Sequence, residues 1–498
     1  MRRVLAAAVL TASATACTSP AKPATDVVPV TEPIAWGVCT DITRPDGEPP
    51  IRQDAGVRCG RLSVPLDYAN PNGKKIQIAL IKLAATDPRK RIGSLVFNFG
   101  GPGASGVDTL DQAAKSLTTL RARYDLVSFD PRGVERSAGV RCGGTADLDK
   151  FTALDTLPPN AETRREIDAA NRRFAQLCAR DSREVLPYVG TVNAARDMDR
   201  IRGALGEEKL NYFGMSYGTQ LGAVYATQYP ENVGRMVLDA PLDPTVGFEQ
   251  RTLAQTRGFQ RVYESFLKSC VQASCEVGKD VRSANANVVR LLNELTVKPL
   301  AVGQRQLTQG LAATGLAAAL YSELTWPFLA TSLGQALKGD GGALLYLADS
   351  YTGRSENGAY TTQMTSFPAI TCVDTAERPD EATLRRTEAA ALKISPLFGS
   401  EGSGGLCRLW PVKGSNDAQR VNATGSAPIL VVGGKNDPAT PYEWAPRLTE
   451  QLRTATLVTY EGEGHGAYLS GNKCVADLVD GYLLNGKVPA RGSTCRPA

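Results

Sequence analysis

Histidine is almost missing from this sequence, with a single copy, His465, in 498 residues. No CxxC or HExxH spacing occurs either, so the usual ligand sets of a zinc site are absent from the sequence. We therefore expect no metal and no cofactor. A lone imidazole is normally an exposed or packed side chain, so any functional role for His465 must be argued from its surroundings.

Long runs of basic residues are also missing. The 56 Lys and Arg residues nearly balance 51 Asp and Glu residues, and the net charge is only +5. The one dense basic patch is residues 89–91, which excludes an electrostatic footprint for nucleic acid. With 42% hydrophobic and 21% charged residues the composition is that of a soluble globular protein, long enough for one large domain with a second one inserted.

The apolar run near the N-terminus, residues 4–10, is too short for the roughly 20 residues that span a bilayer. Arg2 and Arg3 precede it, and small residues at 14–16 lead to Cys17. These features predict a signal peptide. The arrangement resembles a bacterial lipoprotein signal, which implies a lipid anchor on Cys17 and a place on the outer face of the cell membrane. A plain secretory peptide with an incidental Cys17 is the alternative.

Cysteine parity agrees with export. The chain has eleven cysteines, and ten remain when Cys17 is set aside. An exported chain normally oxidises an even set of this kind. Connectivity does not follow from sequence alone, but proximity favours three disulfides: Cys270–Cys275, Cys372–Cys407 and Cys474–Cys495.

Short apolar runs alternate with helical patterns, which predicts a mainly parallel sheet with crossover helices. The strands expected are 75–83, 95–99, 126–129, 210–213, 236–238, 429–432 and 457–460, and residues 61–83 are expected to form two antiparallel strands at one edge. The rhythm stops after Pro241 and resumes at Ile429. We therefore predict an α/β-hydrolase core with a mostly helical cap inserted into it. The expected segments are a signal peptide (1–16), a lipoprotein tether (17–34), the first part of the core (35–243), the cap (244–425) and the second part of the core (426–498).

Residues 214–218 read Gly-Met-Ser-Tyr-Gly, a GxSxG motif. The motif alone is weak, because a glycine-rich chain shows one easily by chance. Here it follows an apolar strand and opens the helix expected at 219–228, which is the context of a nucleophile on a tight strand-to-helix turn. We predict Ser216 as the nucleophile, against the alternative of a structural Gly-Ser turn.

A serine hydroxyl needs a base to remove its proton as it attacks, and His465 is the one imidazole available. In this fold the orienting acid lies between Ser and His along the chain. Asp437 follows a strand and stands on a Pro-flanked turn 28 residues before His465. The competing acids are Glu443, Glu461 and Glu463, none of which combines a strand end with a Pro-flanked turn as Asp437 does.

The oxyanion formed during acyl transfer needs two N–H donors. The backbone of Tyr217, which follows the nucleophile, is predicted to supply one of them. The second is predicted from the Gly-rich loop after the strand at 95–99, where Gly100 and Gly101 are equal candidates. A phosphate-binding loop is the competing interpretation, but the segment has no GxxxxGK[ST] pattern.

Taken together, these motifs resemble the prolyl iminopeptidase group of serine peptidases, and most of all its secreted bacterial tripeptidyl aminopeptidases. The resemblance runs from about residue 35 to the end. Its main segments are 97–103 (FNFGGPG), 130–133 (DPRG), 214–219 (GMSYGT), 369–374 (AITCVD), 434–441 (GKNDPATP) and 464–466 (GHG). Prolyl iminopeptidases carry His where this chain has Phe99, which favours the tripeptidyl branch.

The resemblance implies an exported serine aminopeptidase that releases short peptides or single residues from free N-termini of peptide or protein substrates. A serine esterase or lipase on the same scaffold and a non-catalytic envelope lipoprotein are the alternatives, since a fold does not fix the scissile bond. An exopeptidase must read the substrate ammonium with a carboxylate. Glu249 and Asp374, both in the cap, are the candidates for that carboxylate.

Overall fold

The computed structural model describes residues 33–42, 50–54, 56–400 and 405–497. The predicted signal peptide, Cys17 and nearly all of the tether lie outside these residues.

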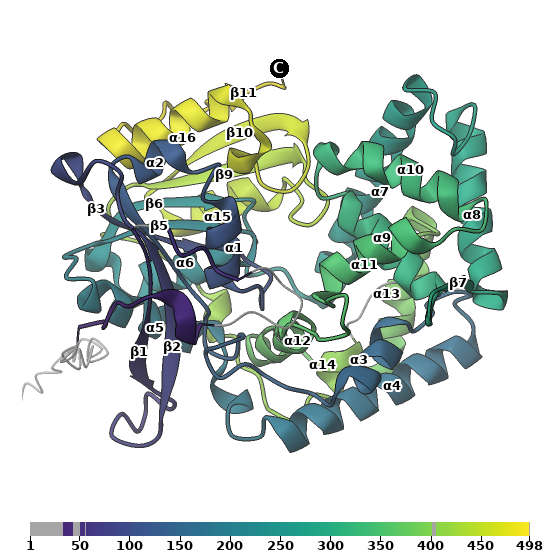
Figure 1. Cartoon of the computed structure of the whole chain (residues 1–498), viewed down its shortest axis with the longest axis horizontal. Coiled ribbons are helices and arrows are strands. Elements are labelled where there is room, and N and C mark those ends of the chain that lie inside the picture. The colour runs from purple at the N-terminus through teal and green to yellow at the C-terminus, as the bar shows by residue number, and fades with distance from the viewer. Residues whose placement is uncertain (1–32, 43–49, 55, 401–404, 498) are drawn as a thin grey trace, which may run out of the picture.

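A nine-stranded sheet forms the centre of the molecule (Figure 1). Its spatial order is β1-β2-β4-β3-β5-β6-β9-β10-β11, with β1–β2 and β2–β4 antiparallel and all later pairs parallel. This is the sheet of the α/β-hydrolase fold, so the predicted fold class is confirmed. The strands are β1 (Val57–Pro65), β2 (Lys75–Leu83), β3 (Gly93–Asn98), β4 (Tyr124–Phe129), β5 (Leu210–Met215), β6 (Val233–Asp239), β9 (Ile429–Asn436), β10 (Ala455–Glu463) and β11 (Thr494–Cys495).

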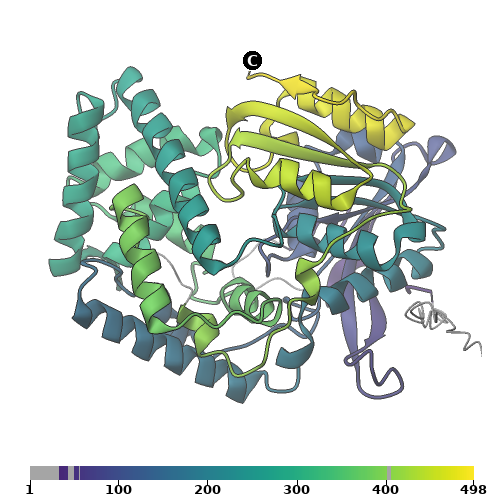
Figure 2. The same cartoon turned by 180° about the vertical axis from the view of Figure 1, so that it is seen from behind.

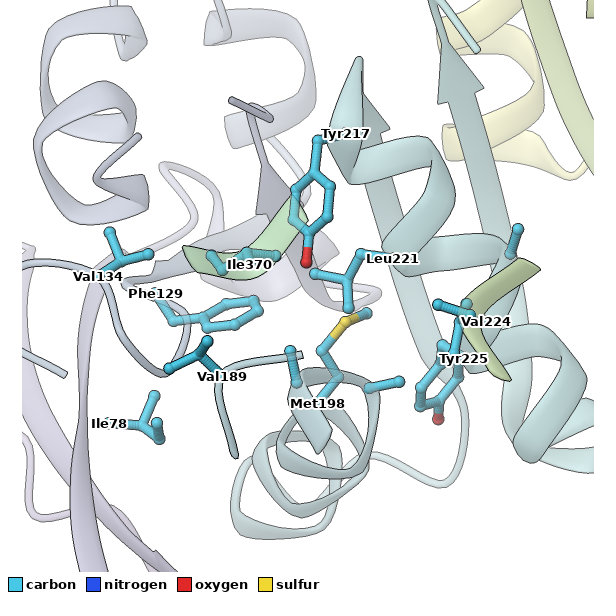
Figure 3. Packing of buried hydrophobic residues seen from close by; sticks show 14 of the residues in the cluster. Ile78, Phe129, Val134, Val189, Met198, Tyr217, Leu221, Val224, Tyr225 and Ile370 are labelled. Atoms are coloured by element: carbon cyan, nitrogen blue, oxygen red, sulfur yellow. The ribbon is translucent and has the colours of Figure 1, made fainter. Parts of the chain in front are cut away.

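Helices cover both faces of the sheet, which explains why its strands read as continuous apolar runs. All six residues of β3 are buried, and the side chains of Leu95 and Val96 belong to the cores on opposite faces. One face carries α1 (Gly106–Ala113), α2 (Thr118–Arg121) and α16 (Lys473–Asn485), and the other carries α5 (Thr191–Ala204), α6 (Tyr217–Gln228) and α15 (Trp444–Leu452). Figure 3 shows the second core, where Met198 of α5 and Leu221 of α6 pack together.

Between β6 and β9 the chain leaves the sheet and forms a mostly helical cap (Figure 1). In the view from behind, α13 runs beside α7 (Figure 2). The cap contains α7 (Phe248–Gln272), α8 (Val281–Val297), α9 (Gln309–Ala319), α10 (Trp326–Ala336), α11 (Gly342–Thr352), α12 (Gln363–Val373), α13 (Glu381–Ile394), α14 (Gly405–Arg408) and a short hairpin of β7 (Leu300–Val302) and β8 (Arg305–Leu307).

Two helices from the first part of the chain also lie beside the cap: α3 (Thr145–Thr152) and α4 (Ala161–Asp181) (Figure 1). The side chain of Gln309 in α9 accepts a hydrogen bond from the backbone N–H of Thr156 at 2.7 Å. Arg164 of α4 pairs with Glu388 of α13 at 2.7 Å. Both helices fall within the segment 35–243 that the sequence analysis assigned to the first part of the core. Apolar side chains of both helices, Leu148 and Phe174 among them, belong to the hydrophobic cluster that also contains Val96 of the sheet, so the two helices join the core to the cap.

Five disulfides join the ten cysteines that follow Cys17. Three of them, Cys270–Cys275, Cys372–Cys407 and Cys474–Cys495, are the pairs that proximity favoured. The other two are Cys39–Cys59 and Cys142–Cys178, which the sequence left open. Within the described part of the chain, no helix combines the length and the apolar character needed to cross a bilayer.

Candidate active site

Ser216 stands on the turn between β5 and α6, with φ 56° and ψ −124°. A positive φ is costly for a residue with a side chain, so this conformation is held by the surrounding structure. The two flanking glycines make the turn possible, because a Cβ on Gly214 would lie 2.3 Å from the carbonyl oxygen of Gly218. The turn leaves Ser216 half-buried at the carboxyl edge of the sheet, as the predicted nucleophile requires.

Asp437 and His465 lie together at the same edge, 28 residues apart in sequence. The Nδ1 atom of His465 is 2.9 Å from each carboxylate oxygen of Asp437. This contact assigns the proton to Nδ1 and leaves Nε2 as the basic nitrogen. Both side chains are removed from solvent, with 5% of the His465 side chain and 0% of the Asp437 side chain exposed.

The turn after β9 holds Asp437 in place. Its carboxylate accepts hydrogen bonds from the backbone N–H groups of Ala439 (2.9 Å) and Thr440 (2.8 Å), and from the Thr440 hydroxyl (2.8 Å). The same hydroxyl is 3.3 Å from Nδ1 of His465. Sequence reasoning missed Thr440. The signal available was its hydroxyl three residues after the acid, within one turn.

The other acids considered for this role have different partners. Glu461 pairs with Lys435 at 2.9 Å, and Glu463 accepts hydrogen bonds from Ser265 (3.1 Å) and Asn436 (3.0 Å). Asp437 is therefore the acid that the fold brings to His465 among Asp437, Glu443, Glu461 and Glu463.

A second buried acid, Asp239 at the end of β6, holds the loop that carries His465. Its carboxylate accepts the backbone N–H groups of Ala467 (3.0 Å) and Tyr468 (2.8 Å). Burial raises the pKa of Asp239 to about 6. Sequence reasoning missed Asp239 too, although its position at the end of a parallel strand was a usable signal.

The pKa of His465 reflects two opposing effects. Burial favours the neutral imidazole and lowers the pKa, whereas the charge and hydrogen bond of Asp437 favour the imidazolium. The charge of Asp239 adds to the second effect, and the pKa of His465 is raised above its usual 6.5. A base of this kind holds a proton more firmly once it has taken it from a nucleophile.

The Gly-rich loop after β3 lies directly against the Ser216 turn. A Cβ on Gly100 would be 2.8 Å from Cβ of Ser216 and 3.2 Å from the backbone nitrogen of Tyr217. The N–H of Gly100 itself donates to Oδ1 of Asn98 at 3.1 Å. Gly101 is exposed at the same point of the loop. Of these two glycines, Gly100 therefore has its N–H engaged within the loop.

Cap residues reach the Asp437 and His465 loops. In α7, a Cβ on Gly258 would lie 2.5 Å from the carbonyl oxygen of Pro438, and Gln255 donates to the carbonyl of Ala439 at 2.8 Å. The carbonyl of Tyr321 accepts the backbone N–H of His465 at 2.7 Å, and its ring stands edge-on to the imidazole with centroids 5.2 Å apart. The cap therefore forms one wall of the site.

The two cap acids predicted to read the substrate ammonium have different surroundings. Glu249 is partly exposed, lies 3.6 Å from Arg386, and lines a cavity of about 390 Å³ together with Glu377 and Asp380. Asp374 is only 9% exposed, and the backbone N–H and hydroxyl of Thr191 both donate to its carboxylate. Asp374 therefore has little surface left for an ammonium group.

Ser216 and His465 occupy adjacent loops, since a Cβ on Gly466 would lie 2.9 Å from Cε of Met215. Among the described contacts the Ser216 hydroxyl makes no hydrogen bond to the imidazole, so that contact remains a prediction. Such catalytic contacts often tighten only around a substrate. The described residues hold no cluster of His, Cys, Asp and Glu suited to a metal ion.

The sheet, the strand-to-helix serine and the Asp–His pair define the chain as a serine hydrolase of the α/β-hydrolase fold. A family model described as TAP-like protein matches residues 395–495. Serine protease Hip1 of Mycobacterium tuberculosis (strain ATCC 25618 / H37Rv) is 34% identical over 482 residues, covering 93% of this chain and 91% of that protein. Carboxylesterase B of the same strain is 34% identical over 475 residues (93% and 90%). Tripeptidyl aminopeptidase of Streptomyces lividans is 33% identical over 456 residues (89% and 84%). The chain belongs to this tripeptidyl aminopeptidase-like family, as the sequence motifs predicted.

Proposed function

We propose that this chain is an exported serine aminopeptidase that releases short peptides, chiefly tripeptides, from free N-termini of peptide or protein substrates. The observation that carries the proposal is the buried Asp437–His465 pair beside the Ser216 turn and under a cap. Two relatives of nearly the full length of the chain are named as a serine protease and a tripeptidyl aminopeptidase, which supports a peptide substrate.

In the proposed mechanism the Ser216 hydroxyl attacks the carbonyl carbon of the scissile peptide bond. His465 Nε2 takes the hydroxyl proton, and Asp437 stabilises the imidazolium and keeps its orientation. The imidazolium then protonates the leaving amine, which departs and leaves an acyl-enzyme on Ser216. A water molecule, deprotonated by the same imidazole, hydrolyses the ester and restores the hydroxyl.

The tetrahedral oxyanion is held by two backbone N–H groups. Tyr217 supplies one of them from the first position of α6. Gly101 is our candidate for the other, because the N–H of Gly100 already donates to Asn98. In a site closed by the cap these dipoles act in a low dielectric, where each donor is worth about 10²–10³ in kcat.

A substrate panel tests the function. Tripeptide p-nitroanilides with a free amine should be cleaved, the same peptides with an acetylated amine should be poor substrates, and Ser216→Ala and His465→Ala should lose turnover by several orders of magnitude. Normal turnover in His465→Ala would reject the mechanism, because the chain has no other histidine.

Two alternatives have distinct outcomes in this panel. A serine esterase is favoured by the relative named carboxylesterase B, and it would hydrolyse p-nitrophenyl esters while leaving the p-nitroanilides intact. A non-catalytic envelope lipoprotein would turn over neither substrate, and Ser216 would not be labelled by a fluorophosphonate.

Glu249 is our candidate for the carboxylate that binds the substrate ammonium, since it is partly exposed and lines a cavity of the cap with Glu377, Asp380 and Arg378. Glu249→Gln should cost about 2–5 kcal/mol of transition-state binding for free-amine peptides and should leave small esters unaffected. Glu388→Gln, which removes a cap carboxylate outside this cavity, is the control. Equal losses on peptides and esters would mean a general defect instead.

We also propose that the mature protein begins at a lipidated Cys17 on the outer face of the cell membrane. The basis is the N-terminal sequence, with its charged start, short apolar run and small residues before the cysteine. One acyl chain binds membranes only marginally, so two or more are expected. Mass spectrometry of the mature N-terminus should find Cys17 carrying diacylglycerol, and an unmodified Cys17 or cleavage elsewhere would reject the anchor.

A further inference from the structure

The cap helix α12 (Gln363–Val373) lies between the two elements that carry the proposed oxyanion donors. With eleven residues it is about 16 Å long. Its first turns touch the Gly-rich loop, and its last residue is followed by Asp374, which bonds toward the Ser216 turn.

At the C-terminal end of α12, three side chains form a chain of hydrogen bonds into the active-site turn. The backbone N–H of Thr191 donates to Oδ1 of Asp374 at 2.8 Å, and the Thr191 hydroxyl donates to Oδ2. The hydroxyls of Thr191 and Tyr217 are 2.6 Å apart. A threonine hydroxyl has one proton, and here it goes to the carboxylate. While Asp374 is ionised, the Tyr217 hydroxyl must therefore donate to Thr191, which fixes the direction of these hydrogen bonds in that state.

This chain of bonds is sealed from solvent. The exposed fractions are 3% for Tyr217, 0% for Thr191 and 9% for Asp374. Figure 3 shows the Tyr217 ring directed into the core beside Leu221, with Ile370 of α12 nearby. Burial makes each lost partner costly, because the remaining polar groups cannot turn to water.

The hydrogen bonds between Thr191 and Asp374 depend on a close approach of Asp374 to the backbone before α5. Gly190, which precedes α5, could not carry a side chain without crowding Asp374, because its Cβ would lie 3.0 Å from Oδ1. The side chain of Tyr217 is thus clamped at its far end, while its backbone N–H lies beside Ser216. A displacement of the clamped ring that is carried to the Cα of Tyr217 would move that N–H with it.

At the N-terminal end, α12 packs on the Gly-rich loop. A Cβ on Gly103 would lie 3.0 Å from the carbonyl oxygen of Gln363 and 3.0 Å from the backbone nitrogen of Phe367. The Ser366 hydroxyl donates to the carbonyl of Gly133 at 2.6 Å, which fastens this half of the helix to the core. The loop with Gly101 therefore rests against the same rigid helix.

We propose that Asp374 and Thr191 are positioning residues, and that α12 uses them to set the distance between the Tyr217 N–H and the Gly101 N–H. The cap then has a role beyond covering the active site, because its contact with the core sets the geometry of the oxyanion hole. The proposal rests on the proposed serine hydrolase mechanism but not on the choice of a peptide substrate.

Three variants remove one link each with little change of shape: Tyr217→Phe, Thr191→Val and Asp374→Asn. Each should lower kcat by between about 10- and 100-fold, less than removal of a whole oxyanion donor, because the N–H is misplaced and not lost. KM should stay within about twofold, since ground-state binding does not need the oxyanion hole. The double variant Thr191→Val/Tyr217→Phe should be no slower than the slower single variant, because both substitutions interrupt the same series of hydrogen bonds. Thr191→Ser keeps the hydroxyl and should restore kcat.

Tyr225→Phe is the matched control. Tyr225 is a buried tyrosine two turns further along α6, and its hydroxyl donates to Asp199 at 3.1 Å. Its loss should lower the thermal midpoint as Tyr217→Phe does, while kcat stays unchanged. If the three variants lower the thermal midpoint without changing kcat, these hydrogen bonds are merely structural and the proposal is overturned. It is also overturned if the kcat losses of Thr191→Val and Tyr217→Phe add in the double variant.

The measurements use a p-nitrophenyl ester as well as a tripeptide p-nitroanilide, and the rate of fluorophosphonate labelling of Ser216 as a third readout. A wild type that cleaves the ester but no peptide would reject the aminopeptidase function and still test the positioning role. A wild type inert to all three probes would overturn both.

Discussion

At the scale of single residues, the protein places buried acids where their surroundings set their roles. The carboxylate of Asp437 faces the imidazole of His465 and accepts three hydrogen bonds from its own turn. Asp374 has hydrogen bonds from Thr191 but no ion pair, and the nearest opposing charge is that of Arg251. Burial raises the pKa of Asp374 to about 7, while the Thr191 hydrogen bonds and Arg251 oppose that rise.

The raised pKa of Asp374 predicts how stability depends on pH. The folded protein holds the Asp374 proton up to about pH 7, whereas the unfolded chain releases it near 3.8. Between these values the folded state binds more protons, so its stability falls as pH rises, and the full penalty is present above about 7. The thermal midpoint of Asp374→Asn minus that of the wild type should therefore increase from pH 4 to pH 7 and then level off. Calorimetry across this range checks it, and a gap that is flat or shrinks with pH would contradict a raised pKa.

At the scale of elements, α7 couples the cap to the turn that holds the acid. Its one small residue at the crossing, Gly258, brings the helix backbone onto the carbonyls of Asp437 and Pro438. A glycine inside a helix normally costs stability relative to alanine, so its presence here reflects the space available.

Gly258→Ala should lower kcat by at least about tenfold, because a misplacement of about 1 Å at the catalytic groups can cost far more than that. The added Cβ would lie 2.5 Å from the Pro438 carbonyl and 3.2 Å from that of Asp437, so either α7 or the acid turn must move. Steady-state kinetics on the ester substrate measure the effect.

Gly481→Ala in α16 is the control, since its Cβ would meet nothing within 4 Å. It should leave kcat unchanged and stabilise the helix by up to about 1 kcal/mol. Equal kcat for the Gly258→Ala variant and the wild type would show that α7 and the acid turn accommodate the added methyl group without misplacing the catalytic residues.

At the scale of the whole molecule, disulfides hold together segments that the sheet does not join. The disulfide Cys142–Cys178 closes a loop of 36 residues and joins the segment that precedes α3 to helix α4. Cys270–Cys275 closes only 5 residues at the end of α7. Because the entropy removed from the unfolded chain grows with loop length, the two bonds differ in their expected contribution.

Replacing Cys142 and Cys178 by serine should therefore lower the free energy of unfolding by about 2 kcal/mol more than replacing Cys270 and Cys275. Urea unfolding of the two double variants, followed by fluorescence, compares them under one condition. Similar losses from both pairs, or a larger loss from the short loop, would show that native-state packing and not loop entropy dominates.

The sequence by itself predicted eight of the nine strands of the sheet, all but β11, together with the class of enzyme and the candidate triad. Strands of a parallel sheet bring their carboxyl ends to one edge, so Ser216, Asp437 and His465 could be assigned from the strand that precedes each of them. The GxSxG turn could be assigned for a partly local reason, because a Cβ on Gly214 would clash with Gly218 in the same turn, whereas a Cβ on Gly218 would clash with Asn98 at the end of β3.

Only the tertiary structure decided what depends on contacts between distant segments. Thr191 and Asp374 are 183 residues apart, and their bond gives Asp374 a buried partner where the sequence suggested a free carboxylate for an ammonium. The hydrogen bond from the Gly100 N–H to Asn98, on which our choice of Gly101 as the candidate donor rests, depends on a side-chain direction that no pattern predicts. The amphipathic pattern of α4 showed that one face is buried but not which polar partners lie beside it, and the structure places Arg164 of α4 against Glu388 of the cap. Periodicity and spacing are local, whereas the partner of a buried group is chosen by the whole fold.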